Sequence, residues 1–260
     1  MSSTSQQRSR TAKLMTGNVL AFIFMVVMNF LANYLPLNNI TTAEISDRYY
    51  NIFTPAGFTF IIWGVIYISL ALLVVYFIWG AVKGKEGPIQ AIYDIGWYFA
   101  ASSVLNGVWI FTWHYDLIVA SLIVMLALLL SLILLYRRLR SVQVEGSSYL
   151  LPFSIYLGWI SVATIANVAT LTVKFDWGWF GLSSEFWLTV LLVVIIALAA
   201  YMILRVRDSV YGLVILWALG GITAARWGEA GGFSYATGAA IAAAVMVFLM
   251  LVRKQFSSNR

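Results

Sequence analysis

The chain has 260 residues, of which 62% are hydrophobic and 10% are charged, and it contains no cysteine. This composition excludes an ordinary soluble globular domain, and the absence of cysteine excludes disulfides, thiolate metal sites and cysteine nucleophiles. The formal net charge of +6 does not predict a nucleic-acid partner, because the basic residues lie between and beyond long apolar runs.

Eight predominantly apolar segments follow one another along the chain. Each is close to the ~20 residues that a helix needs to cross the hydrocarbon core of a membrane. The segments are 14–36, 57–82, 92–113, 116–136, 149–173, 185–204, 210–225 and 233–252. Runs such as "LIVASLIVMLALLLSLILLY" lack the alternation of a membrane β-barrel strand. We therefore predict an all-α membrane protein, a polytopic bundle of about eight transmembrane helices.

The distribution of basic residues predicts the orientation of these segments. Only Arg48, Lys174 and Arg226 lie on one side of an eight-span arrangement. The other side, which carries both termini, holds Arg8, Arg10, Lys13, Lys83, Lys85, Arg137, Arg138, Arg140, Arg205, Arg207, Arg253, Lys254 and Arg260. Because basic loops stay in the cytoplasm, we expect a multi-pass protein of the cell membrane with both termini cytoplasmic. The basic residues are expected to set the orientation alone, and binding of anionic membrane lipid is the alternative role.

Two distant stretches of the chain are similar to each other. "DIGWYFAASSVLNGVWIFTWH" from Asp94 aligns without gaps with "DSVYGLVILWALGGITAARWG" from Asp208. The alignment matches Gly107 with Gly221. Two parallel halves of four helices are a known transporter architecture, so a secondary transporter built from two such halves is one functional hypothesis.

Polar and aromatic side chains share faces on three of the predicted helices. Residues four apart lie on one face of a helix, and the faces carry Trp63 and Tyr67; Ser102, Asn106, Trp109 and Trp113; and Trp159, Ala163 and Asn167. Small-molecule sites are mostly apolar with a few fixed polar groups, so these faces predict a ligand site. The alternative is that the asparagines join helices, where an interhelical hydrogen bond contributes ~0.6 kcal/mol on average.

The sequence does not favour catalysis, and we expect no enzyme, no catalytic residue and no metal site. The single histidine, His114, lies beside Asp116 in a short turn, where capping or a surface position is the usual role. The middles of the apolar segments carry no charge, which argues against an ion-driven pump with a charged site there. Arg226 and Glu229, three residues apart, are expected to pair with each other.

Three motifs resemble helices of the TspO/MBR family, the tryptophan-rich sensory proteins and translocator proteins. "LPFSIYLGWISVATIAN" resembles the fifth helix of that family, "TPAGFTFIIWGVIY" the second and "VLNGVWIFTW" the third. The matching positions are Pro55, Trp63, Tyr67, Asn106, Trp109, Trp159, Ser161, Ala163, Thr164 and Asn167. The motifs occur in the family's order. Gly57 replaces the tryptophan that the family carries six residues before Trp63.

The resemblance implies a domain organisation. A TspO-like five-helix membrane domain is expected at 14–176, after a cytoplasmic tail at 1–13. Three additional transmembrane helices are expected at 177–252, followed by a cytoplasmic tail at 253–260. Family members are often dimers, so a homodimer is possible.

The resemblance also implies a function: a membrane receptor or carrier that binds a flat hydrophobic small molecule such as a porphyrin, in sensing or transport. No cofactor is expected to be obligatory, and a porphyrin or haem-type molecule is the expected ligand. The implied ligand-binding residues are Pro55, Trp63, Tyr67, Asn106, Trp109, Trp159, Ala163 and Asn167. The loop 37–55 is expected to act as a lid.

Overall fold

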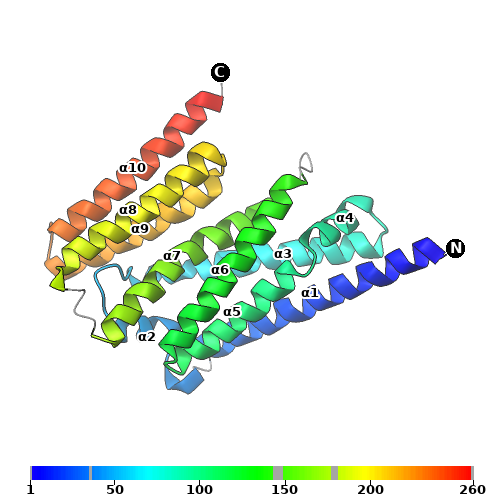
Figure 1. The fold of residues 1–260 in the computed structure, drawn as a ribbon, viewed down its shortest axis with the longest axis horizontal. Coiled ribbons are helices and arrows are strands. Elements are labelled where there is room, and N and C mark those ends of the chain that lie inside the picture. Colours follow the sequence, from blue (N-terminus) through cyan, green and yellow to red (C-terminus); the bar gives the residue numbers. More distant parts are fainter. Residues whose placement is uncertain (1, 35–36, 143–148, 177–180, 259–260) are drawn as a thin grey trace. The chain divides into compact units, whose positions relative to one another are not determined.

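The computed structural model describes residues 2–34, 37–142, 149–176 and 181–258, and throughout these ranges the regular structure is helical (Figure 1). The α-helices are α1 (Ser2–Tyr34), α2 (Thr42–Arg48), α3 (Ile62–Val82), α4 (Glu86–Ile95), α5 (Tyr98–His114), α6 (Ile118–Ser141), α7 (Leu150–Lys174), α8 (Ser184–Ala200), α9 (Ser209–Ala230) and α10 (Tyr235–Ser258). Short helical turns are η1 (Leu37–Asn39), η2 (Gly57–Ile61) and η4 (Tyr201–Arg205). The all-α class is confirmed.

Among the described residues, seven helical segments are long and apolar enough to cross a membrane. They are Ser9–Ala32, Gly57–Val82, Ile118–Ser141, Leu150–Lys174, Ser184–Arg205, Ser209–Glu229 and Tyr235–Gln255. The chain is therefore a polytopic helical membrane protein, as predicted.

The segment predicted as one span at 92–113 is divided in the structure. Helix α4 ends at Ile95, and Gly96 then takes φ 56° and ψ −137°, a conformation that a residue with a side chain rarely adopts. Helix α5 begins at Tyr98 and has 17 residues. This is the lower limit of about 17–25 residues for a membrane-crossing helix.

The helices form two compact units. Unit 1 contains Met1–Thr42 and Trp63–Tyr156, and unit 2 contains Ala43–Ile62 and Leu157–Arg260. The division falls at the start of α3 and inside α7, so the first turns of α7 belong to unit 1 and the remainder to unit 2. The boundary expected at residues 176 and 177 meets the stretch 177–180, which lies outside the described residues.

Helix α5 packs against both α1 and α6 in unit 1. Gly107 permits the close approach of α1, because a Cβ atom there would lie 2.4 Å from the ring of Phe24. The first turns of α7 join the same core, with the Phe153 and Phe99 rings edge to face at 5.7 Å. Small residues at such contacts are typical of helix packing in membranes.

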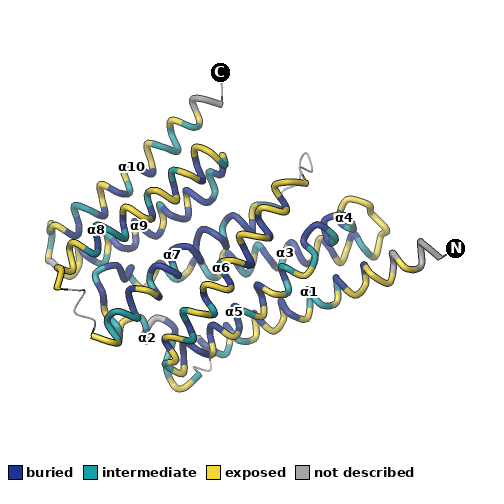
Figure 2. Tube along the Cα trace, viewed as in Figure 1, coloured by how far each residue is buried: buried dark blue, intermediate teal, exposed yellow. Residues whose placement is uncertain are grey.

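Helix α10 packs against both α9 and α8 in unit 2. Asp208 caps the N-terminus of α9 by accepting a hydrogen bond from the Tyr211 N–H at 3.0 Å. Figure 2 shows buried and exposed residues alternating along the helices of both units. Many exposed side chains are apolar, as with Leu72, which is 67% exposed. In a membrane-spanning helix such side chains face lipid.

Candidate functional site

Five side chains of unit 1 form an aromatic–amide cluster: Trp63 and Tyr67 of α3, Asn106 and Trp109 of α5, and Tyr156 of α7. The Trp63 ring is stacked on Tyr67 at 5.5 Å and on Trp109 at 5.9 Å between ring centroids. Tyr156 meets Trp63 at a steep angle, with the centroids 6.4 Å apart. Offset and edge-to-face contacts of this kind are favourable for aromatic rings. Three helices therefore contribute to one aromatic surface.

The amide of Asn106 connects this cluster to α1. Asn106 donates through Nδ2 to the Tyr156 hydroxyl at 2.9 Å, and its Oδ1 accepts from Asn29 Nδ2 at 2.8 Å. Asn29 also donates to the Met25 carbonyl at 2.9 Å. Both asparagines and Tyr156 are buried. The network therefore joins α1, α5 and α7 in the interior of unit 1. Asn29 and Asn106 thus have the helix-joining role that the sequence left as the alternative to ligand binding.

The cluster also contains polar groups that are buried without a hydrogen bond. The indole Nε1–H of Trp109 has no hydrogen-bond partner, and the Trp109 side chain is only 4% exposed. The Tyr67 hydroxyl is also buried, beside the amides of Asn106 and Asn29 but outside hydrogen-bonding geometry. An unpaired buried polar group costs about 1–3 kcal/mol. Such a group calls for a specific explanation, and a bound ligand is one.

The predicted site residues of α7 lie in unit 2. Trp159 meets Phe60 edge to face, with the ring centroids 6.1 Å apart. Asn167 donates through Nδ2 to the Ala163 carbonyl of its own helix at 3.2 Å. Pro55, buried in the segment before η2, belongs to unit 2 as well. Of the eight predicted residues, the aromatic–amide cluster thus contains Trp63, Tyr67, Asn106 and Trp109.

The two hydroxyls of the same α7 stretch also bond to their own helix. Thr164 Oγ1 donates to the Ile160 carbonyl at 2.7 Å, and Ser161 Oγ donates to the Leu157 carbonyl at 2.8 Å. Serine and threonine hydroxyls inside helices often donate to the carbonyl of the preceding turn. Ser161, Thr164 and Asn167 of this stretch therefore bond to the backbone of α7, whereas Tyr156 bonds to Asn106 of α5.

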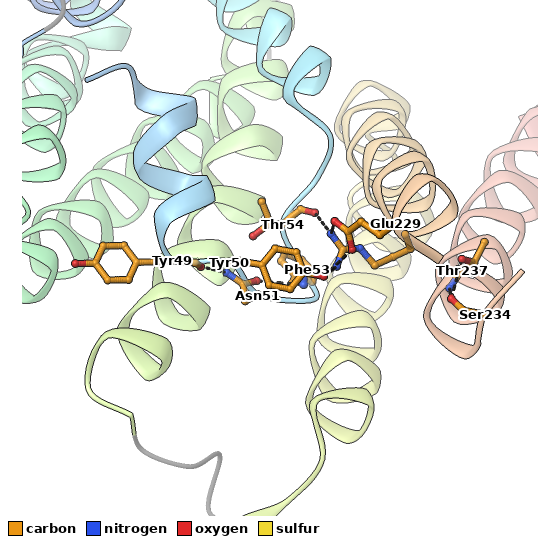
Figure 3. Close-up of polar contacts among 9 residues, drawn as sticks. Tyr49, Tyr50, Asn51, Phe53, Thr54, Glu229, Ser234 and Thr237 are labelled. Carbon is orange, nitrogen blue, oxygen red and sulfur yellow. Dashed lines mark hydrogen bonds and ion pairs between the residues drawn. The ribbon is translucent and has the colours of Figure 1, made fainter. Parts of the chain in front are cut away.

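A polar cluster on α9 and on the segment between α2 and η2, called the Arg226 cluster, consists of Tyr50, Thr54, Arg226 and Glu229. Figure 3 shows Tyr50, Thr54 and Glu229 of this cluster. Arg226 Nη2 bonds to Glu229 Oε1 at 2.8 Å and to the Thr54 carbonyl at 3.2 Å, and Nη1 bonds to the Tyr50 hydroxyl. Tyr50 in turn donates to Glu229 Oε2 at 2.6 Å. The pairing expected between Arg226 and Glu229 is confirmed. Burial, together with the hydrogen bond to Glu229, raises the pKa of Tyr50 above its usual value.

His114 is a buried structural group in unit 1. Its Nδ1 lies 2.8 Å from the Ile110 carbonyl of its own helix, and Asn38 donates to the His114 carbonyl at 3.0 Å. The side chain is wholly buried, so the surface position considered for it is wrong, whereas its carbonyl does take part in capping the end of α5.

A comparison with protein-family models matches residues 14–253 to the TSPO-like protein family. The chain belongs to the TSPO-like protein family. The matched range includes α8, α9 and most of α10, which the three sequence motifs did not reach. No curated protein and no solved structure matched the chain.

In this TSPO-like protein, sequence reasoning missed two residues of the aromatic–amide network as site residues. The Tyr156 hydroxyl accepts a hydrogen bond from Asn106 Nδ2, and Asn29 Nδ2 donates a hydrogen bond to Asn106 Oδ1. A signal for Tyr156 was present, because it precedes Trp159 by three residues and so lies near the same face of α7. No local pattern singles out Asn29 from the other asparagines of the apolar segments.

Proposed function

We propose that this TSPO-like protein is a membrane receptor or carrier that binds a flat hydrophobic small molecule such as a porphyrin. The observation that carries the proposal is the Trp109 indole N–H, which is buried without a partner beside the stacked rings of Trp63 and Tyr67. A conjugated ligand would offer a flat face that stacks on these rings and an acceptor atom for the Trp109 N–H.

Binding of such a ligand has a structural requirement. The rings of Trp63 and Trp109 are in contact with each other, so a ligand must replace one ring-to-ring contact with a ring-to-ligand contact. The exchange is favourable when the ligand is larger than an indole, because it buries more apolar area at about 25 cal/mol per Å². The roles expected for Pro55, Trp159, Ala163 and Asn167 stay predictions, supported by the family resemblance alone.

The test is a titration of the purified protein with a porphyrin, followed by the shift of the porphyrin Soret band. Trp63→Leu removes a stacking face and is expected to weaken binding roughly two- to twelvefold, corresponding to about 0.5–1.5 kcal/mol per aromatic pair. Trp109→Phe keeps a ring but removes the unpaired N–H, and weaker binding is expected there also.

The matched control is Trp79→Phe on the same helix as Trp63. Trp79 is half exposed and contacts Tyr76 rather than the cluster, so its substitution should leave the affinity unchanged. Absence of saturable binding to the wild-type protein would remove the porphyrin proposal. Unchanged affinity in folded Trp63→Leu and Trp109→Phe proteins would place the ligand elsewhere.

A secondary transporter with two parallel halves is our second proposal. It is favoured by Gly107 and Gly221, which the internal alignment matches and which both lie where another segment approaches closely. The aligned acidic residues differ locally, since Asp94 lies within α4 whereas Asp208 caps α9. Uptake into liposomes driven by a proton or sodium gradient would support the transporter, and gradient-independent binding would support the receptor.

We also propose that both termini face the cytoplasm of the cell that carries the protein in its surface membrane. Because the chain has no cysteine, a thiol-reactive label attaches only to a cysteine introduced at a chosen position. In intact cells, a membrane-impermeant maleimide should label a cysteine at Tyr115, in the exposed turn after α5, and should not label one at Lys83, after α3. The reverse labelling pattern would contradict the orientation.

A further inference from the structure

The break between α4 and α5, both in unit 1, lies beside α1. Tyr93, in the last turn of α4, shares a hydrogen bond with Thr11 of α1, and the two hydroxyl oxygens are 2.7 Å apart. Further along α1, Asn18 donates through Nδ2 to the carbonyl of Gly96 at 2.9 Å, and Gly96 is the residue that follows α4. Helix α1 therefore contacts both the last turn of α4 and the break itself.

Asp94, in the same turn of α4, is buried although its side chain is acidic. It is only 4% exposed; Oδ1 accepts a hydrogen bond from Gln90 Nε2 at 3.0 Å, and Oδ2 has no hydrogen bond. Asp94 forms no ion pair with any residue that the structure describes. A buried carboxylate is costly unless a positive charge is paired with it or a metal ion is bound to it. The described part of the chain supplies no such partner for Asp94.

The surroundings of Asp94 do not compensate its charge in another way. The C-terminal end of a helix carries a partial negative charge, and the last turn of α4 contains no basic residue. Arg10 of α1 lies over the ring of Tyr93, and Arg138 of α6 bonds to the Tyr93 carbonyl at 3.3 Å. Both arginines are exposed, so solvent and salt screen their charges. Neither of them neutralises the Asp94 carboxylate.

Asp208, which the internal alignment matches with Asp94, shows how a buried carboxylate is compensated. It lies at the N-terminus of α9, where its Oδ1 accepts a hydrogen bond from the Tyr211 N–H at 3.0 Å. The partial positive charge of a helix N-terminus stabilises an acidic group. Asp94 lies at the opposite kind of helix end, so the same residue type there requires a positive charge from another source.

Asn18 places a second acceptor oxygen at the break. Its Nδ2 donates to the Gly96 carbonyl, which fixes the orientation of the amide, because a reversed amide would direct oxygen at oxygen. The Oδ1 atom is buried and has no hydrogen bond, and the residue is 7% exposed. Carboxylate and amide oxygens are the ligands that hard metal cations take. One carboxylate with a neutral oxygen balances a single positive charge, which favours a monovalent ion over a divalent one.

We propose that the break between α4 and α5 binds a monovalent metal cation, Na⁺ or K⁺, with the Asp94 carboxylate and the Asn18 amide oxygen as its protein ligands. In transporters with discontinuous helices, unwound backbone and helix C-terminal ends hold the coupling ion in the same way. The bound ion neutralises Asp94 and links α1 to α4. The site is independent of the proposed porphyrin binding, and it gives the transporter proposal a candidate coupling ion.

The first experiment measures ion binding to the purified full-length protein in detergent, by scintillation proximity with radioactive Na⁺ and with radioactive Rb⁺ as the tracer for K⁺. The wild type is expected to bind at least one of the two ions saturably. Asp94→Asn keeps the size of the side chain and removes its charge, so the affinity should fall roughly tenfold or more, the scale of losing an interaction with a charged group. Absence of saturable binding of both ions to the wild type, or equal affinity in folded Asp94→Asn, would overturn the site.

Asp208→Asn is the matched control. It removes the same charge from the aligned position, and asparagine caps a helix as well as aspartate does, so the ion affinity should be unchanged. Asn18→Leu is the second variant if Asp94→Asn does not fold. It removes the amide oxygen and leaves Asp94 in place, and weaker ion binding is expected. Unchanged affinity in a folded Asn18→Leu protein would contradict the role of Asn18 as a ligand.

The second experiment measures the unfolding temperature at constant ionic strength, with choline replaced by Na⁺ or by K⁺. At ten times its Kd, the bound ion should raise the unfolding temperature of the wild type by about 3–6 °C. The shift should disappear in Asp94→Asn and remain in Asp208→Asn. Measurement at about pH 9 keeps an accessible carboxyl ionised, so that a proton does not replace the metal ion. Equal unfolding temperatures of the wild type in choline, Na⁺ and K⁺ at this pH would overturn the proposal.

Discussion

Two sets of buried polar side chains show how the same residue types serve different purposes in apolar helices. In unit 1, Asn106 of α5 bonds to Asn29 of α1 and to Tyr156 of α7. In unit 2, Thr164 of α7 bonds to the carbonyl four residues earlier in its own helix. The first arrangement determines which helices meet and in which register. The second satisfies a polar group without specifying any neighbour.

The difference has an energetic consequence. Removing a side chain that bonds across helices leaves its partners buried and unpaired, which costs more than the bond itself contributed. Removing a hydroxyl that bonds to its own helix leaves a carbonyl that already accepts the helical N–H bond. Polarity in a membrane helix therefore does not by itself indicate a ligand contact, and the partner of each group has to be known.

The largest effect is expected for Asn106→Leu. The substitution removes the N–H donor of the Tyr156 hydroxyl oxygen and the acceptor of one Asn29 N–H, so the free energy of unfolding should fall by about 1–3 kcal/mol. Denaturant or thermal unfolding in one detergent measures the change. A loss below about 0.5 kcal/mol would mean that the network does not hold the three helices together.

A smaller effect is expected for Tyr156→Phe, which keeps the ring against Trp63 and removes only the hydroxyl. Loss of the hydrogen bond from Asn106 and of the weak one to the Met25 sulfur should lower the free energy of unfolding by about 0.5–1.5 kcal/mol. The double variant with Asn106→Leu should be less destabilised than the sum of the two single variants, because both remove the same bond. Strict additivity would show that the two residues act independently.

The smallest effect is expected for Thr164→Val, a substitution of nearly the same shape. Because Oγ1 donates to the Ile160 carbonyl of its own helix, the free energy of unfolding should change by less than about 0.5 kcal/mol. Porphyrin affinity should also be unchanged. A loss as large as that of Asn106→Leu would remove the distinction between the two sets of polar residues.

Part of the candidate site could be predicted from the sequence because it depends on spacing along single helices. Trp63 and Tyr67 lie four apart and do stack, and Asn106 and Trp109 do share a face of α5 in contact with α3 and α7. The functions of Asn29 and Tyr156 could not be predicted in this way. Their partners lie 77 and 50 residues away along the chain, and one sequence contains no information on such pairings.

The sequence by itself determined the helical class, the polytopic membrane character and the pairing of Arg226 with Glu229. Each follows from the length and polarity of continuous runs or from spacing within one helix, which are local properties. Only the tertiary structure decided that Gly96 divides a predicted span, that Ser161, Thr164 and Asn167 bond to the backbone of α7, and that α9 contacts the segment before α3. These features depend on backbone conformation and on contacts between residues that are distant in the sequence. Several tertiary arrangements are compatible with the same local sequence pattern, and side-chain packing selects one of them.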